Sequence, residues 1–338
     1  MRTCKRHGGL RDDSDHGAES QNHGAEDLLF DALLFSLYDN GDGLRELRLC
    51  GAEGCGQVLD QMGGFIGVGG DTFYRPPTPD TRTQAHVGLD RRRRGASSGV
   101  LYSREVLSEK TTVDSTLVPT RLQADVTGPE PVMTALLRAL RSEPVLRVGT
   151  ARSRGLGTCA VEQFEEVDQA AAIPTAAPIA DRVRQFNEHW AARCQSQGES
   201  PGNPLIALTL QTPALFTDAF LEPTLSPTGA DLLQAAFESE EAHADALSPL
   251  TKVHQIARPR QVQSWNGLAG FPHSSGLGLA AGSVLVFEAP DLGDALFGAL
   301  RHIEEAGIGL RRHFGFGRVR VCSPIHTHLH EHMPQPYA

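Results

Sequence analysis

The chain has 338 residues, of which 40% are hydrophobic and 21% charged, and its formal net charge is −10. This composition is typical of a globular protein with room for two domains, each with its own core. No apolar stretch approaches the roughly 18 residues of a membrane span, and the first residues lack the apolar core of a signal peptide. We therefore expect a cytoplasmic protein with no membrane partner. The negative charge argues against general affinity for nucleic acid, but a local basic surface is compatible with it because salt screens charges beyond about 8–10 Å.

The first half of the chain begins with a polar segment without periodicity, up to residue 25. The hydrophobic pattern then predicts a short amphipathic helix at 26–38 and a loop region with short strands at 45–75. Alternating apolar and polar residues predict strands next, and a proline near a first turn predicts the start of a helix. The expected elements are strands at 85–90, 100–107 and 116–126, a polar loop at 91–99, a helix at 131–140, and strand, glycine loop and strand at 144–164.

The second half opens with an expected helix in the alanine-rich segment 165–200 and a linker at 196–204. The pattern then restarts. It predicts a strand at 205–215, a helix at 228–243, strand and loop at 252–270, a strand at 282–289, a helix at 291–306, and a loop with a final strand at 307–323.

The same order of elements occurs near 116–164 and again near 282–323: strand, helix, glycine loop with arginines, strand. Two copies of a split β-α-β unit explain this repeat. The expected fold class is therefore α+β, with two ferredoxin-like (RRM-like) units in tandem.

The repeated loops are GTARSRGLG at 149–157 and GIGLRRHFGFGR at 307–318. Glycine permits positive φ and close backbone approach, which exposes N–H groups to phosphate oxygens. Arginine binds phosphate and stacks on bases. Neither loop has the order of a dinucleotide fingerprint or the GK[ST] of a Walker loop. The alternative is a pair of glycine turns with solvated arginines. The occurrence of both loops at equivalent positions of an internal repeat argues against this alternative.

Three segments resemble the RAMP superfamily, the RNA-binding subunits of CRISPR effector complexes: HVGLDRRRRGASSGVLYSREVL, VLRVGTARSRGLGTCAVEQF and GIGLRRHFGFGRVRV. A weaker match is SWNGLAGFPHSSGLGLAAGSVLVFE. The layout is most similar to the double-RAMP (Cas5-like) subunit of type III-D complexes. The resemblance covers residues 84–323 and extends poorly to 1–83, so the first unit is expected to be incomplete at its N-terminus.

The resemblance implies a non-catalytic subunit that requires no cofactor. Its partners would be the repeat-derived 5′ tag of the CRISPR RNA, the large subunit and the backbone RAMP subunits. The expected RNA-binding residues lie in both loops and in the basic run before residue 95: Gly149, Arg152, Arg154, Gly155, Gly157, Gly307, Gly309, Arg311, Arg312, His313, Gly315, Gly317, Arg318, Arg91, Arg92, Arg93 and Arg94.

The expected domain boundaries follow from these patterns. Residues 1–83 form the N-terminal part of the first RAMP unit with a possible zinc-binding insertion, and 84–170 form its remainder. Residues 171–204 are helix and linker, 205–323 the second unit, and 324–338 a flexible His-rich tail.

Two further hypotheses concern metal and catalysis. Cys4 with His7, and Cys50 with Cys55, form two close pairs that suit a tetrahedral structural zinc, although free cysteines in loops are the alternative. Some RAMP proteins cleave precursor RNA with histidine acid–base chemistry, and His313 is the best candidate here, but no partner acid is evident. An unrelated α+β enzyme with phosphate-binding loops is the remaining alternative.

Overall fold

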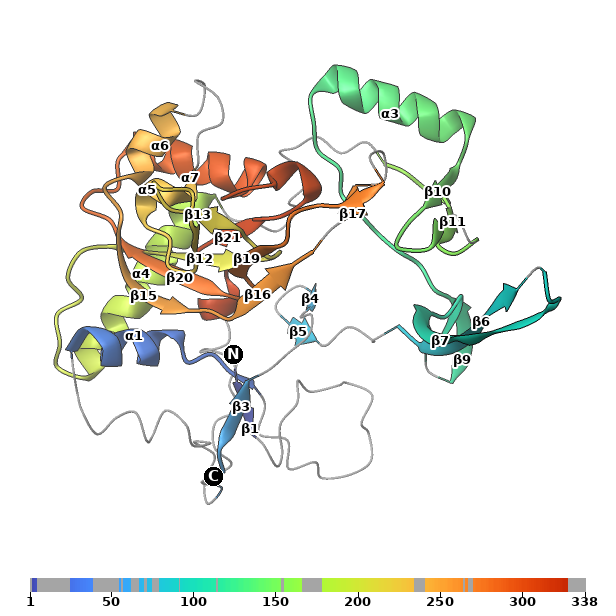
Figure 1. Ribbon diagram of the computed structural model, residues 1–338. Helices are drawn as coiled ribbons and strands as arrows, with labels where there is room; N and C mark the ends of the chain where they lie inside the picture. Colours follow the sequence, from blue (N-terminus) through green and yellow to red (C-terminus); the bar gives the residue numbers. More distant parts are fainter. Residues whose placement is uncertain are drawn as a thin grey trace. The chain divides into compact units, whose positions relative to one another are not determined.

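The computed structural model describes residues 2–4, 25–38, 55, 57–61, 67–69, 72–74, 79–90, 92–113, 115–152, 155–165, 178–233, 241–263, 265–266 and 270–327. The chain divides into two compact units, one formed by 1–75 with 175–338 and the other by 76–174. Both are built from helices and small antiparallel sheets, so the chain is a mixed α+β protein, as the sequence predicts. Figure 1 shows these elements.

The larger unit is organised around a four-stranded antiparallel sheet in the order β15-β20-β12-β21. The strands are β12 (Leu205–Leu210), β15 (Thr251–Ile256), β20 (Val284–Glu288) and β21 (Val319–Val321). Strands β20 and β12 are therefore central, and β15 and β21 lie at the edges. Helices α5 (Gly229–Leu232) and α6 (Glu241–Leu247) join β12 to β15, and α7 (Asp294–Ala306) joins β20 to β21. This is the split β-α-β arrangement of a ferredoxin-like unit.

Helices cover both faces of this sheet. The side chains of β12 and β20 are buried along almost their whole length, which is typical of strands covered on both sides. Helices α6 and α7 pack against each other, α1 (Leu29–Tyr38) contacts β15, and α4 (Ile179–Ser196) contacts β12 and β21. Figure 1 shows α6 and α7 over one side of the sheet and α1 on the other. The core between them includes the fully buried rings of Phe30, Phe186 and Trp190.

An insertion between β15 and β20 extends away from the sheet as two nested hairpins. The inner pair is β17 (Trp265–Asn266) with β18 (Phe271–Pro272), and the outer pair is β16 (Pro259–Val262) with β19 (Gly276–Leu279). Another hairpin joins β13 (Phe216–Thr217) to β14 (Pro223–Thr224). The N-terminal part adds β1 (Arg2–Cys4), β2 (Ala25–Glu26) and β3 (Leu59–Gln61) in one sheet, and a hairpin of β4 (Gly67–Gly69) with β5 (Thr72–Tyr74).

The smaller unit consists of hairpins and one helix. Its elements are β6 (Thr81–Asp90) with β7 (Gly95–Leu107), β8 (Lys110–Val113) with β9 (Thr116–Pro119), α3 (Glu130–Ser142), and β10 (Val145–Arg147) with β11 (Thr158–Ala160). None of its described side chains is buried. The described residues of this unit form no four-stranded sheet.

Three predicted elements differ from the structure. The strand expected at 116–126 ends at Pro119, and Leu122 and Val126 are 59% and 58% exposed, because no described strand pairs with them. The helix expected at 228–243 stops at Leu232, since Leu233 adopts an extended conformation, and α6 begins at Glu241. The polar loop expected at 91–99 is shorter, because β7 begins at Gly95.

The sequence predicts a flexible tail from residue 324, but the structure places residues 324–327 in the fold. His326 is 4% exposed, its Nδ1 contacts Asp27 Oδ2, and its Nε2 lies 2.8 Å from Thr209 Oγ1 on β12. Its ring also packs edge-on against Phe186. His326 and the neighbouring Thr327 are therefore buried parts of the fold, and the other tail histidines lie outside the described residues.

Candidate nucleic-acid interface

The second glycine loop connects α7 to β21 and has an unusual backbone. Helix α7 ends at Ala306, and Gly307, which follows it, has φ +84°. Positive φ recurs at Gly309, Arg311, Gly315 and Gly317, and a single 3₁₀ turn, Arg312–Phe314, forms the apex. Four of these five positions are glycine, the residue that a left-handed backbone conformation favours. Arg311 is the exception, with φ 59° and ψ 29°.

Two of these glycines serve close packing of the loop against the fold. A Cβ on Gly317 would lie 1.8 Å from the carbonyl oxygen of Ile308, and one on Gly309 would lie 2.2 Å from that of Leu215. The N–H groups of Ile308, Gly309, Leu310, Gly315 and Gly317 donate to carbonyl oxygens within the protein. Most loop N–H groups are thus used internally, which corrects the expectation that glycines expose them to phosphate. Among the described residues, none accepts a hydrogen bond from the N–H of Arg311 or His313, at the apex.

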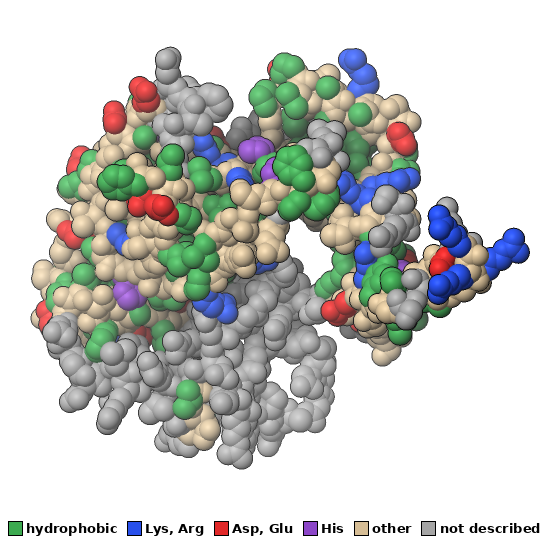
Figure 2. Space-filling model, in the orientation of Figure 1, with side chains coloured by type: hydrophobic (Ala, Val, Ile, Leu, Met, Phe, Trp, Pro, Cys, Tyr) green, Lys and Arg blue, Asp and Glu red, His purple; other side chains and the backbone are tan. Residues whose placement is uncertain are grey.

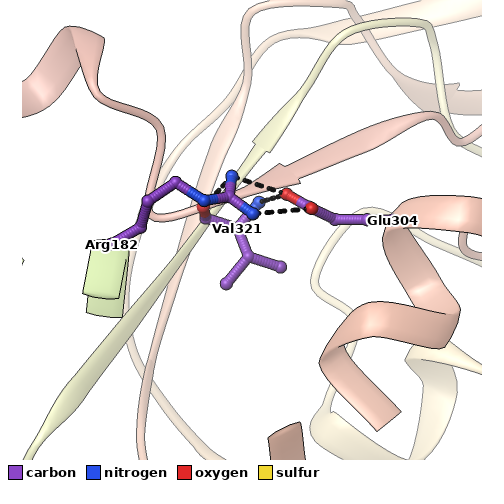
Figure 3. A network of polar contacts seen from close by, with 3 residues as sticks. All are labelled: Arg182, Glu304 and Val321. Atoms are coloured by element: carbon purple, nitrogen blue, oxygen red, sulfur yellow. Dashed lines mark hydrogen bonds and ion pairs between the residues drawn. The ribbon is translucent and has the colours of Figure 1, made fainter. Parts of the chain in front are cut away.

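A buried ion pair fixes the strand that follows the loop. Arg182 of α4 donates through Nη1 and Nη2 to the two carboxylate oxygens of Glu304 on α7, at 2.8 and 2.7 Å. Glu304 Oε1 accepts the N–H of Val321 at 2.7 Å, and Arg182 Nη1 donates to the carbonyl oxygen of Val321 at 2.9 Å. Figure 3 shows this network. It satisfies the outward-facing N–H and carbonyl groups of Val321 on edge strand β21, which would otherwise be open to pairing.

The apex of the loop presents aromatic and basic side chains. His313 and Phe314 are exposed, and Arg312 and Arg318 are half-buried. Arg311 is turned back toward the hairpin insertion, where its Nη2 donates to the carbonyl oxygen and the Oγ of Ser274, at 2.9 and 3.0 Å. No pattern in the sequence indicates this contact, because its partners are 37 residues apart.

Arg320 contributes less to this surface than the sequence suggests. It lies on β21 beyond the loop, and burial lowers the pKa of its guanidinium although nearby Glu304 opposes the shift. The other two cations of the second loop, Arg312 and Arg318, are half-buried.

The first glycine loop repeats the backbone of the second at a constant offset of 160 residues. The segment VGTARSRGLGTCAV at 148–161 aligns with IGLRRHFGFGRVRV at 308–321 without a gap. Val148 N–H donates to the Gly157 carbonyl at 2.8 Å, and Ile308 N–H donates to the Gly317 carbonyl at 2.9 Å. The φ angles also agree: 56° and 59° at Ala151 and Arg311, 84° and 82° at Gly155 and Gly315, 71° and 72° at Gly157 and Gly317.

This alignment refines the predicted pairing of the loops. Gly149 corresponds to Gly309 rather than to Gly307, and Arg152 corresponds to Arg312. The surroundings differ, since a Cβ on Gly149 would meet no atom within 4 Å, whereas one on Gly309 would meet the Leu215 backbone. Arg152 is exposed, and Arg154 lies outside the described residues.

The predicted basic run forms the turn between β6 and β7. Arg92, Arg93 and Arg94 occupy this turn and are exposed, and Arg94 has φ 52°. Asp90 Oδ1 accepts the N–H groups of Arg92 and Arg93, at 2.9 and 3.2 Å, so this carboxylate fixes the turn. Arg91 lies outside the described residues.

The predicted zinc ligands stay a prediction. Cys4 belongs to β1, Cys55 is half-buried, and His7 and Cys50 lie outside the described residues. Within the described ranges, no group of three or more His, Cys, Asp or Glu side chains is arranged to hold a metal.

Charge is distributed unevenly between the two units. Residues 76–174 hold 13 Lys and Arg against 12 Asp and Glu, whereas the rest of the chain holds 18 against 29. In Figure 2, Lys and Arg side chains are prominent on the part with α3, β6 and β7, and acidic side chains are spread over the part with α5, α6 and α7. The negative net charge thus comes from the larger unit, while the first loop and the Arg92–Arg94 turn lie in a nearly neutral one.

Fold and site together define the class: an α+β protein with a ferredoxin-like sheet and two equivalent glycine–arginine loops. No described helix has the length and apolar character to span a membrane. Neither a protein-family model nor a curated protein sequence matches the chain. The solved structures similar to it include three of Cas6 (TTHA0078): a point mutant, a substrate-mimic complex and a product complex. Their TM-scores are 0.34, 0.33 and 0.33, at 17%, 16% and 16% identity, covering 67% of this chain and 81%, 82% and 81% of theirs. An overlap this loose carries no argument about function.

Proposed function

We propose that the chain is a non-catalytic, RNA-binding RAMP subunit of a type III CRISPR effector complex, acting in the cytoplasm. In this proposal its two glycine–arginine loops hold the repeat-derived 5′ tag of the CRISPR RNA. Other faces of the chain pack on the large subunit and the backbone subunits. Residues 205–323 contribute one ferredoxin-like unit, and 84–170, which include the other glycine loop, belong to the first.

The observation that carries the proposal is the repeat of one loop backbone, 160 residues apart, with an arginine at the same apex position. Close packing explains why glycine is present at 157, 309 and 317, and positive φ explains it at 149, 155 and 315. Neither explains why Arg152 and Arg312 occupy the equivalent 3₁₀ position in both copies. An arginine presented on the same backbone in each copy is suited to a phosphate of an RNA strand.

The surroundings of the second loop favour an anionic ligand such as phosphate. No Asp or Glu occurs from residue 306 to 330, so every charged side chain of the second loop and β21 is positive. Contacts with the phosphate backbone of RNA give affinity without recognising the base sequence. Recognition of a defined tag would then depend on base contacts near the loops.

The test measures RNA binding by the purified chain at several salt concentrations. The probe is a fluorescently labelled single-stranded RNA carrying the repeat-derived tag, read by anisotropy. Arg152→Ala combined with Arg312→Ala should weaken binding and flatten the log–log salt dependence by about 0.7 per lost phosphate contact. Arg184→Ala is the matched control, since Arg184 is exposed on α4 and pairs with Asp181.

Two outcomes would contradict the proposal. The first is an unchanged salt slope in the double variant, which would show that the loops do not contact phosphate. The second is recovery of the assembled complex without CRISPR-derived RNA. Cleavage of the probe that disappears in His313→Ala would instead identify a processing endoribonuclease.

A further inference from the structure

The apex of the second loop carries a cluster of aromatic rings that packing does not explain. Phe314 is 57% exposed. The His313 ring lies beside it with centroids 4.1 Å apart, and the His273 ring packs edge-on at 5.7 Å. Exposed aromatic side chains grouped in this way mark interaction sites more often than solitary ones do.

The cluster is held in place by two separate parts of the fold. The 3₁₀ turn that bears Phe314 is closed by hydrogen bonds from Phe314 N–H to the Arg311 carbonyl and from Gly315 N–H to the Arg312 carbonyl, at 2.9 and 2.8 Å. Arg311 then fastens the turn to Ser274, next to His273. The rings are therefore positioned before any ligand arrives, which lowers the entropic cost of binding.

The same surface continues onto the inner hairpin of the insertion. Trp265 on β17 and Phe271 on β18 are 62% and 56% exposed. Trp265 pairs with Pro272, the residue directly before His273. Exposed rings on a loop that also carries Arg312 and Arg318 suit bases joined by phosphates, because each base offers a flat face and each phosphate a negative charge.

The first loop lacks this feature. At the positions equivalent to His313 and Phe314 it has Ser153 and Arg154, and at the position of Phe316 it has Leu156. The two loops thus share a backbone but differ in side chains. The arginine at the apex is therefore common to both loops, whereas the exposed aromatic residues occur only in the second.

We propose that the second loop selects unpaired nucleotides: one base stacks on the exposed ring of Phe314 beside His313, while the adjoining phosphate lies on Arg312 and Arg318. This inference rests on the proposed RNA-binding function and adds that the bound RNA is single-stranded at this loop. A base paired within a duplex has both faces stacked on its neighbours and cannot also stack on Phe314.

The experiment compares a labelled single-stranded RNA with the same strand annealed to its complement, using the full chain. The single strand should bind more tightly, and Phe314→Ala should weaken it by about 5- to 150-fold, the range for loss of one stacked base. Phe314→Tyr should retain most of the affinity because it keeps the ring. Leu310→Ala, which removes an exposed apolar side chain from the same loop, should bind as the unmodified protein does.

A spectroscopic readout separates stacking from a change in loop shape. 2-Aminopurine placed at successive positions of the single strand should be quenched at one position, and Phe314→Ala should relieve that quenching. Equal affinity for single strand and duplex, together with wild-type affinity in Phe314→Ala, would overturn this inference. If Arg312→Ala still weakened binding in that case, the RNA-binding function would stand without the stacking site. Failure of the unmodified protein to bind either RNA would overturn both.

Discussion

The buried ion pair beside β21 allows a sharp test of what holds the second loop in place. Glu304→Gln keeps the size of the side chain and an oxygen that can accept the N–H of Val321, but it removes the charge that compensates Arg182. The side chains of Arg182 and Glu304 are 2% and 6% exposed, so solvent cannot replace the lost partner. Breaking such a buried pair costs about 3–5 kcal/mol of unfolding free energy. The glutamine amide oxygen can still accept hydrogen bonds at this position from Arg182 and from the Val321 N–H, so we expect a value near the lower end, about 3 kcal/mol.

The double variant Arg182→Met with Glu304→Gln should be less destabilised than the sum of the single changes. It contains no buried charge at this site, and the introduced amide oxygen can still accept the Val321 N–H. The remaining loss is the partner of the Val321 carbonyl oxygen, which costs about 1–3 kcal/mol when left unpaired. The shortfall from additivity measures the coupling between the two side chains.

Urea unfolding followed by tryptophan fluorescence provides the measurement. Trp190 is 1% exposed in the same core, whereas Trp265 is 62% exposed, so the change in emission reports mainly on Trp190. Glu188→Gln is the control, because Glu188 is exposed on α4 and its contact with Arg184 should contribute at most about 1 kcal/mol. An unfolding free energy of Glu304→Gln within about 1 kcal/mol of the unmodified protein would refute the reasoning.

Three further predictions concern pH, backbone and metal. Burial lowers the pKa of His254 from its ordinary 6.5, so the unfolded state binds more protons than the folded state as the pH falls through 6.5. The free energy of unfolding should therefore decrease as the pH falls below 6.5, and His254→Gln should make this decrease smaller. Gly317→Ala should lower the melting temperature more than Gly315→Ala, because both have positive φ but only Gly317 lacks space for a Cβ; equal shifts would contradict the packing argument. If Cys50 and Cys55 help to bind zinc, the purified protein should contain close to one zinc per chain and lose stability on chelation, and metal-free protein of unchanged stability would contradict this.

The second unit is well predicted because its local sequence patterns and its tertiary contacts agree. Strand β20 begins with four apolar residues, of which two are β-branched and one is aromatic, and α7 has a buried apolar face. Helix α4 is likewise where its periodicity places it. The same reasoning fails at 116–126, where alternation indicates a strand. Alternation records only which side chains could share a face, and a strand forms only where a neighbour supplies hydrogen bonds.

Contacts between distant parts of the chain could not be predicted. His326 is part of a polar histidine run in the sequence, yet it is buried because Asp27, 299 residues away, meets its ring. Arg311 is one of two adjacent arginines with no difference in sequence context. In the structure it binds Ser274 while Arg312 remains at the apex. Hydrophobic periodicity carries no information on which polar side chain meets which.

The glycine loops show most clearly how structure changes the meaning of a sequence pattern. In the sequence, glycine is the natural functional signal, because phosphate-binding loops are rich in it. In the structure, Gly309 and Gly317 are required where the loop passes close to other backbone, and Gly315 is favoured by a left-handed turn. A loop with these constraints would contain glycine whether or not it bound anything. The RNA-binding proposal therefore depends on the side chains at the apex, Arg152, Arg312 and Phe314, and on the recurrence of the arginine at one position of a duplicated backbone.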